Sequence, residues 1–124
     1  MDVKLAVITL WSEDVNRTAH FYRDVIGLPL ISIDRGRPHF ALGGGYLVIL
    51  QGRPHEAEHS VPPRFPVLAF AVHDLEKAVQ HLESHGVELP WGVEQDEDSR
   101  WVMFHDPGGN LLEIAMLGVK KHHV

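Results

Sequence analysis

The run LAVITLWSED, residues 5–14, is the stretch of sequence that decides the fold. It begins as an apolar, β-rich segment and ends in Asp14, a residue type that caps helices by accepting a backbone N–H bond. Apolar side chains then recur every three or four residues, which predicts a helix from about Val15 to Val25. Gly27 follows, and glycine is a common helix stop because it adopts left-handed backbone angles without strain. A strand therefore leads directly into an Asp-capped helix.

The same pattern returns about 60 residues further along the chain. The run VLAFAVHD, residues 67–74, again ends in an aspartate, and a helical apolar face follows it and closes at Gly86. A fixed offset of this kind indicates an internal duplication, although two unrelated amphipathic units can resemble each other by chance. The predicted short extended segments are Leu30–Asp34, Pro38–Leu42 and Tyr46–Gln51 after the first helix, and Val87–Leu89, Arg100–His105 and Leu111–Leu117 after the second.

These elements predict an α+β fold made of two βαβββ modules. Module one spans about 3–52 and module two about 67–117, and a connector rich in proline and histidine occupies 53–66. We expect the two modules to form a single domain, because 124 residues is an ordinary length for one domain.

Composition and charge narrow the class of function. The net charge of -6 disfavours nucleic acid and anionic membranes as partners, because both attract clustered Lys and Arg. The sequence has no cysteine, which excludes disulfides and thiolate chemistry. It also shows neither a signal peptide nor a run of ~20 apolar residues. We therefore expect a cytoplasmic protein whose partner is a small molecule.

Two stretches resemble a known family. The first is WSED at 11–14 with HFYRDVIGLPL at 20–30, and the second is FHDPGGNLLEI at 104–114. Together they resemble the first helix and the last hairpin of the vicinal oxygen chelate superfamily, which includes glyoxalases, bleomycin-resistance proteins and extradiol dioxygenases. The resemblance covers nearly the whole chain. It implies that each module curls its mixed sheet into a half-cup and that the protein is a homodimer.

The sequence DPGGN at 106–110 needs no family to explain it. Proline presets φ near -65° and glycine permits positive φ, so the five residues are suited to a tight turn between strands. We interpret the motif as a hairpin and expect a functional contribution only from Glu113, which follows it.

The resemblance also implies four metal-ligand positions, two in each module, and most of them carry aliphatic residues here. The first-strand positions fall on Val7 and Val67. The last-strand position falls on Val48 or Ile49 in module one, depending on where a gap is placed, and on Glu113 in module two. A divalent ion needs several oxygen or nitrogen donors. We therefore expect no metal and no other cofactor at these positions, and this expectation disfavours an enzyme.

A different metal motif lies in the connector, where HEAEH at 55–59 matches the zinc pattern H-E-x-x-H. Pro54 and the Pro62-Pro63 pair limit any helix there to about two turns, and the segment has no apolar face. A solvated loop is therefore favoured over a zinc peptidase site. The His122-His123 pair is interpreted as part of a frayed tail.

Binding of a ligand is the remaining function, and strand alternation selects the candidate residues. Trp11 and Trp101 fall near strand ends where a flat or cationic ligand can stack, although each is also a reasonable core residue. Glu113 has an alternative role as a satisfied strand carboxylate, and His39 as an exposed strand residue. The predicted ligand-binding set is Val7, Thr9, Trp11, His39, Tyr46, Val48, Val67, Trp101, Met103 and Glu113.

The expected function is that of a metal-independent small-molecule binding protein of the glyoxalase/bleomycin-resistance type, which binds or sequesters a neutral or cationic drug. The alternative is a metal-dependent lyase, isomerase or dioxygenase with a displaced site, built from Glu113 and either His39 or His105. The sequence leaves the identity of the ligand open.

Overall fold

The computed structural model describes residues 2, 5–53 and 67–116. The chain divides into two compact units, and the short segment Asp106–Asn110 belongs to the first of them. Among the described residues, unit 1 therefore contains 2, 5–53 and 106–110, and unit 2 contains 67–105 and 111–116.

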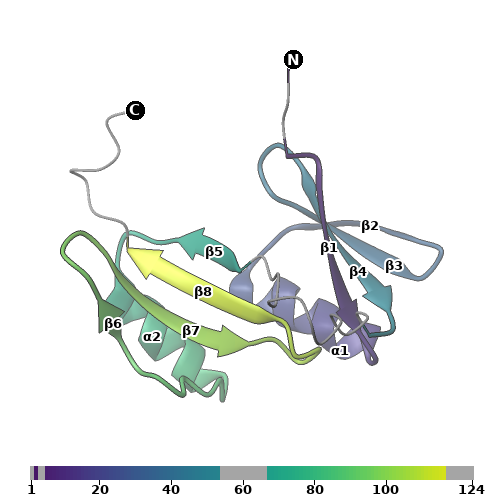
Figure 1. The fold of residues 1–124 in the computed structure, drawn as a ribbon. Helices are drawn as coiled ribbons and strands as arrows, with labels where there is room; N and C mark the ends of the chain where they lie inside the picture. The colour runs from purple at the N-terminus through teal and green to yellow at the C-terminus, as the bar shows by residue number, and fades with distance from the viewer. Residues whose placement is uncertain (1, 3–4, 54–66, 117–124) are drawn as a thin grey trace, which may run out of the picture. The chain divides into compact units, whose positions relative to one another are not determined.

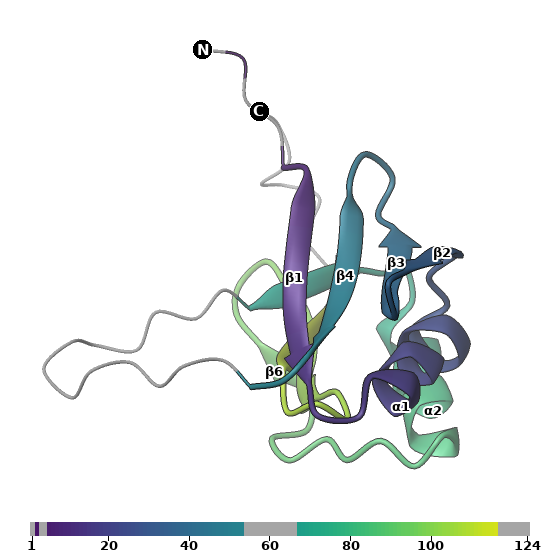
Figure 2. The same cartoon turned by 90° about the vertical axis from the view of Figure 1, so that its right-hand side faces the viewer.

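Unit 1 is a four-stranded mixed sheet with one helical segment packed on it (Figure 1). Its elements are β1 (Val7–Ser12), α1 (Val15–His20), η1 (Phe21–Ile26), β2 (Leu30–Asp34), β3 (Arg37–Ala41) and β4 (Tyr46–Gln51). The strand order is β1-β4-β3-β2, with β1 parallel to β4 and the other pairs antiparallel. Figure 2 shows β1 and β4 side by side. The helix packs on the face that carries the fully buried Phe40, Leu47 and Ile49.

Unit 2 repeats this plan. Its elements are β5 (Leu68–Ala71), α2 (Leu75–Ser84), β6 (Glu94–Gln95), β7 (Arg100–His105) and β8 (Leu111–Met116), in the sheet order β5-β8-β7-β6. α2 packs against β7 and β8 (Figure 1). Its Leu75 and Leu82 are fully buried. The predicted α+β fold with two βαβββ modules is confirmed. Within the described ranges no helix is long and apolar enough to cross a membrane.

Both predicted helix caps are present. The carboxylate of Asp14 accepts a bond from Arg17 N at 3.1 Å, and that of Asp74 accepts one from Lys77 N at 3.1 Å. Because the first backbone N–H groups of a helix have no partner within it, these two bonds fix where α1 and α2 begin.

Two sequence predictions differ from the structure. The first helix is α-helical only to His20 and continues to Ile26 as a π-helix, which ends at Gly27 with φ of 88°. The strand predicted at Val87–Leu89 is wrong, because the sheet's edge strand is Glu94–Gln95 instead. The reason lies in the turn that follows, where Asp96 N donates to Ser99 O at 3.0 Å. That turn pairs residues 94 and 95 with Trp101 and Arg100.

The turn at 106–110 has a second role besides reversing the chain. Asp106 is only 4% exposed, and its carboxylate accepts bonds from Tyr22 Oη at 2.7 Å, Gly108 N at 2.8 Å and Asn110 N at 2.9 Å. Burial, and then the charge and hydrogen bond of Asp106, raise the pKa of Tyr22 well above its usual value, so the hydroxyl stays protonated and donates. The carboxylate therefore ties the turn to the helical segment of unit 1.

The same turn lies directly against β1. Asn110 Nδ2 donates to Trp11 O at 2.9 Å. A Cβ added at Gly108 would lie 2.6 Å from that same carbonyl oxygen, so glycine is required for the approach. The prediction of a hairpin is confirmed, and the bonds from its turn to Trp11 and Tyr22 are what sequence reasoning missed.

We predict that replacing Tyr22 by Phe destabilises the protein. The Asp106 carboxylate would stay buried and lose one donor, which costs about 1–3 kcal/mol of unfolding free energy. Tyr46→Phe is the matched control, because Tyr46 is 46% exposed, and it should change the unfolding free energy by less than about 0.5 kcal/mol. Urea unfolding followed by tryptophan fluorescence measures both. Equal losses in the two variants would contradict the role given to the Tyr22–Asp106 bond.

A second prediction concerns the turn before β4. A Cβ at Gly45 would lie 2.5 Å from Ala6 O, the acceptor of the bond from Tyr46 N, whereas one at Gly44 would meet nothing within 4 Å. Gly45→Ala should therefore cost about 1–3 kcal/mol of unfolding free energy through crowding of backbone atoms. Gly44→Ala, the control, should cost less than about 0.5 kcal/mol. The same urea titration checks the pair, and a Gly44→Ala loss as large as that of Gly45→Ala would refute the explanation.

Candidate functional site

The sheet face of unit 1 opposite α1, here called the unit 1 open face, carries the predicted ligand residues of module one. Strand register places Thr9 beside Val48 and Val48 beside His39, in one row across β1, β4 and β3. The neighbouring row joins Val7 to Tyr46. Because side chains alternate along each strand, these five side chains share one face.

Solvent reaches much of the unit 1 open face. Val7 is 50% and Tyr46 46% exposed, while Val48 is 7% exposed. Trp11 lies on the same face one row further along β1, and its ring packs against Gly52, where an added Cβ would lie 3.2 Å from ring atom Cε3. Trp11 is therefore half-buried, with part of its ring covered by backbone and part accessible.

His39 is the imidazole of this face, and its orientation is fixed. Its Nδ1 lies 2.8 Å from the carbonyl oxygen of Arg37. A carbonyl can only accept, so Nδ1 carries the hydrogen and Nε2 is left as an acceptor when the ring is neutral. The ring also lies edge-on to Tyr46, with 6.4 Å between the centroids. His39 can therefore accept a hydrogen bond from a ligand beside an aromatic ring.

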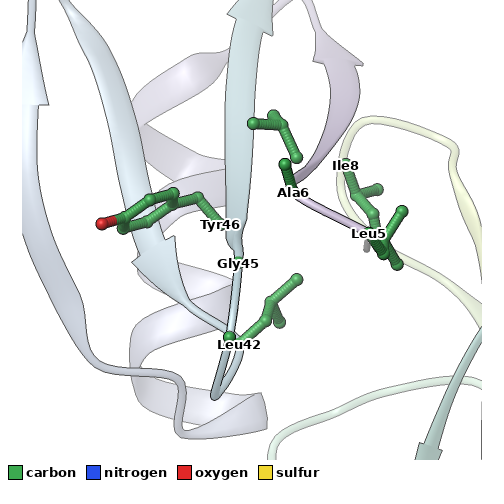
Figure 3. A pocket seen from close by; sticks show the side chains of 8 residues that line it. Leu5, Ala6, Ile8, Leu42, Gly45 and Tyr46 are labelled. Atoms are coloured by element: carbon green, nitrogen blue, oxygen red, sulfur yellow. The ribbon is translucent and has the colours of Figure 1, made fainter. Parts of the chain in front are cut away.

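A shallow apolar pocket of ≈ 270 Å³ lies at one end of the unit 1 sheet. The pocket lies beside the starts of β1 and β4, and Figure 3 shows the aliphatic side chains that line it. Val7 and Tyr46 belong both to this pocket and to the open face. The volume is below the roughly 300–1,000 Å³ of most small-molecule sites, so the pocket suits one part of a ligand. The lining residues are Leu5, Ala6, Val7, Ile8, Leu42, Gly44, Gly45 and Tyr46.

The unit 2 open face is the sheet face opposite α2, and it carries a carboxylate. Glu113 of β8 lies between Ala69 of β5 and Met103 of β7 in register, and its side chain is half-buried. The next row contains Trp101 beside Ala115. Glu113, Met103 and Trp101 are therefore brought together on one surface, as the sequence predicts.

Two further groups lie along the same surface. His105 pairs in register with Leu111, and its ring centroid is 6.2 Å from that of Trp91. Val67 directly precedes β5 and is 39% exposed, and alternation places it on the side of Ala69. All ten predicted residues therefore lie on one or other open face, and their contact with a ligand stays a prediction.

The donor set on these faces does not fit the divalent metal that the resemblance implies. Val7 and Val48 share the unit 1 open face and supply no donor. In unit 2 Glu113 supplies one carboxylate, and Val67, the other expected ligand position of that module, supplies no donor. Across residues 2, 5–53 and 67–116, no group of three or more His, Asp or Glu residues is placed to hold an ion. HEAEH at 55–59 and the His122-His123 pair lie outside the described residues.

Sequence reasoning missed two polar groups on these faces. Ser32 becomes a neighbour of His39 through a bulge in β2 between Leu30 and Ser32, which a simple alternation pattern does not reveal. Glu94 pairs with Trp101 because the edge strand lies later in the chain than predicted. In the sequence, only the turn-forming residues at 96–99 indicate where Glu94 lies.

Two βαβββ units, each with an open face beside a helix-covered core, define a protein of the glyoxalase-like fold class. The signature of the Glyoxalase/Bleomycin resistance protein/Dioxygenase superfamily matches residues 4–114, and the chain belongs to this superfamily.

Relatives and solved structures agree with this assignment. The chain is 32% identical over 117 residues to the uncharacterized protein YaeR of Escherichia coli (strain K12), covering 86% of this chain and 91% of that protein. It is similar to the lactoylglutathione lyase of Agrobacterium tumefaciens, with a TM-score of 0.72, 22% identity and coverage of 94% and 95%. It is also similar to TnmS3, an antibiotic binding protein from Streptomyces sp. CB03234, with a TM-score of 0.74, 20% identity and coverage of 95% and 99%. At these identities the two structures show the fold alone.

The geometry of His39 gives a prediction that spectroscopy can check. Long-range ¹H–¹⁵N correlation spectra of the neutral ring should show Nδ1 protonated and Nε2 unprotonated, because the Arg37 carbonyl accepts from Nδ1. A spectrum with the hydrogen on Nε2 would remove His39 as the acceptor on the unit 1 open face.

Proposed function

We propose that this protein is a small-molecule binding protein of the glyoxalase/bleomycin-resistance type that acts without a bound metal ion. The observation that carries the proposal is the set of aliphatic residues at the family's metal positions, Val7, Val48 and Val67. A divalent ion placed against such side chains loses its water ligands and gains no donors in return. Binding of a small molecule, in contrast, requires no metal donors and can use the apolar surface that these residues provide.

The open faces favour a flat ligand that is neutral or cationic. Tyr46 on the unit 1 open face and Trp101 on the unit 2 open face each offer aromatic surface for stacking, and Glu113 adds a carboxylate one row away from Trp101. Arg37, at the end of the unit 1 sheet, is neutralised by Asp34 at 3.2 Å. The net charge of -6 also attracts cations over a longer range.

TnmS3 supports this role by its fold, because it is an antibiotic binding protein with a similar arrangement of strands and helices. In the proposal the chain works in the cytoplasm, as the sequence predicts, and forms a homodimer, as the family resemblance implies. The second candidate is a metal-dependent lyase, isomerase or dioxygenase with a displaced site. Its support is that Glu113 and His105 share the unit 2 open face, although two donors fall short of an ordinary catalytic metal site.

We predict that untagged protein binds bleomycin, used as a metal-free cationic probe, equally well with and without EDTA. Glu113→Gln should weaken binding at least five-fold, because the carboxylate lies on the unit 2 open face, one row away from Trp101. Glu83→Gln is the matched control, since it removes the same charge from an exposed position on α2, and it should leave the affinity unchanged. Tryptophan fluorescence titration measures the affinities.

The opposite results would favour the second candidate. These are binding that EDTA abolishes and Zn²⁺, Ni²⁺ or Mn²⁺ restores, or cleavage of lactoylglutathione that is lost in Glu113→Gln. Equal weakening by Glu113→Gln and Glu83→Gln would show that net charge, and not the open face, attracts the probe.

A further inference from the structure

The unit 2 open face places two carboxylates next to one indole ring. In the sheet, β7 lies between β6 and β8 (Figure 1). Glu94 of β6 lies directly opposite Trp101 of β7, and Trp101 lies opposite Ala115 of β8. Glu113 is two residues before Ala115, so it is the diagonal neighbour of Trp101 on the same face. Trp101 therefore has a carboxylate-bearing neighbour on either side, and all three side chains are half-buried.

The described part of unit 2 places no Lys or Arg on this face. It contains only Lys77, which lies on α2, and Arg100. Arg100 precedes Trp101 in β7, so alternation directs its side chain to the opposite face of the sheet. There its guanidinium pairs with Glu76 of α2 at 2.6 Å. The negative charge beside Trp101 is therefore not neutralised by a Lys or Arg of the described unit.

An aromatic ring with carboxylates beside it attracts a cation without coordinating it. The face of an indole ring attracts positive charge through its quadrupole, and a carboxylate attracts it over several ångströms. The carboxylate oxygens therefore need not converge on one point, as the donors of a metal ion must. A charge spread over a flat organic ring meets these conditions, because such a ring can stack on the indole and gives up little hydration.

The rest of the face leaves room for such a ring. Ala69 and Ala71 of β5 are exposed and lie in register beside Glu113 and Ala115. Because their side chains are single methyl groups, the sheet surface beside the two carboxylates is low. A flat ligand over Trp101 can extend across these alanines.

We propose that the unit 2 open face binds a flat organic cation, held over Trp101 between Glu94 and Glu113. This inference rests on the proposed function and narrows its ligand from neutral or cationic to cationic. It also makes Glu94 a specificity-determining residue, since Glu94 distinguishes a charged ring from an uncharged ring of the same shape.

Two probes of nearly equal shape separate charge from stacking. 10-Methylacridinium carries a fixed positive charge, whereas acridine is uncharged at pH 8, where histidine side chains are also largely neutral. Equilibrium dialysis of the full-length protein against each probe at low salt gives the two affinities. The protein should bind 10-methylacridinium about ten-fold more tightly than acridine.

The variants assign this preference to residues. Glu94→Gln and Glu113→Gln should each reduce the ratio of the two affinities about three-fold, and the double variant should bring it close to one. Glu83→Gln removes the same charge from an exposed position on α2 and should leave the ratio unchanged. Trp101→Leu should weaken both probes, because stacking acts on either ring. Circular dichroism checks that every variant keeps its fold.

Three results would overturn the proposal. They are equal affinity for the two probes, equal effects of Glu94→Gln and Glu83→Gln, and no binding of either probe at millimolar concentration. Metal-free bleomycin binding together with any of these results would leave the proposed function intact and remove only the cation site. Bleomycin binding that EDTA abolishes, together with the expected probe ratio, would remove the metal-independent function and leave the cation site.

Discussion

The buried carboxylate of Asp106 is the interaction on which unit 1 depends. A carboxylate removed from water is costly unless every oxygen is bonded, and here Tyr22, Gly108 and Asn110 all donate to it. The bonds join a five-residue turn, far along the chain, to the helical segment and to β1. Among the described residues no buried side-chain nitrogen or oxygen lacks a partner. The DPGGN sequence therefore meets two requirements at once, the geometry of a turn and the satisfaction of a buried charge.

The two sheets share a plan but present different chemistry, and strand alternation explains how. One set of alternate residues packs under the helix and forms the core, with Leu47 and Leu112 both fully buried. The other set lies on the open faces, where no helix packs against it, so its side chains can differ between the two units. Unit 1 thus presents hydroxyl, imidazole and aromatic groups around Val48, while unit 2 presents the carboxylate of Glu113. Aliphatic residues can replace metal ligands on such a face without loss of the fold.

Sequence patterns predicted the features that depend on neighbouring residues and missed those that depend on distant ones. The Asp14 and Asp74 caps and the two helical faces follow from short-range rules, and the structure contains them. The π-helix at Phe21–Ile26 leaves the same apolar spacing as an α-helix, so periodicity does not reveal it. The predicted edge strand at Val87–Leu89 lies too early in the chain, because the turn that sets the true edge depends on bonds to the Asp96 carboxylate, which an apolar pattern does not reveal. The burial of Asp106 depends on a partner 84 residues away, and no local pattern reports that contact.

The fate of metal-binding residues in this chain illustrates why geometry, and not composition, decides where an ion can bind. On a sheet, donors must come from neighbouring strands, so Glu113 flanked by Ala69 and Met103 is isolated whatever other histidines the sequence contains. The connector motif HEAEH matches a zinc pattern in sequence, and such a match does not by itself place two donors on one surface.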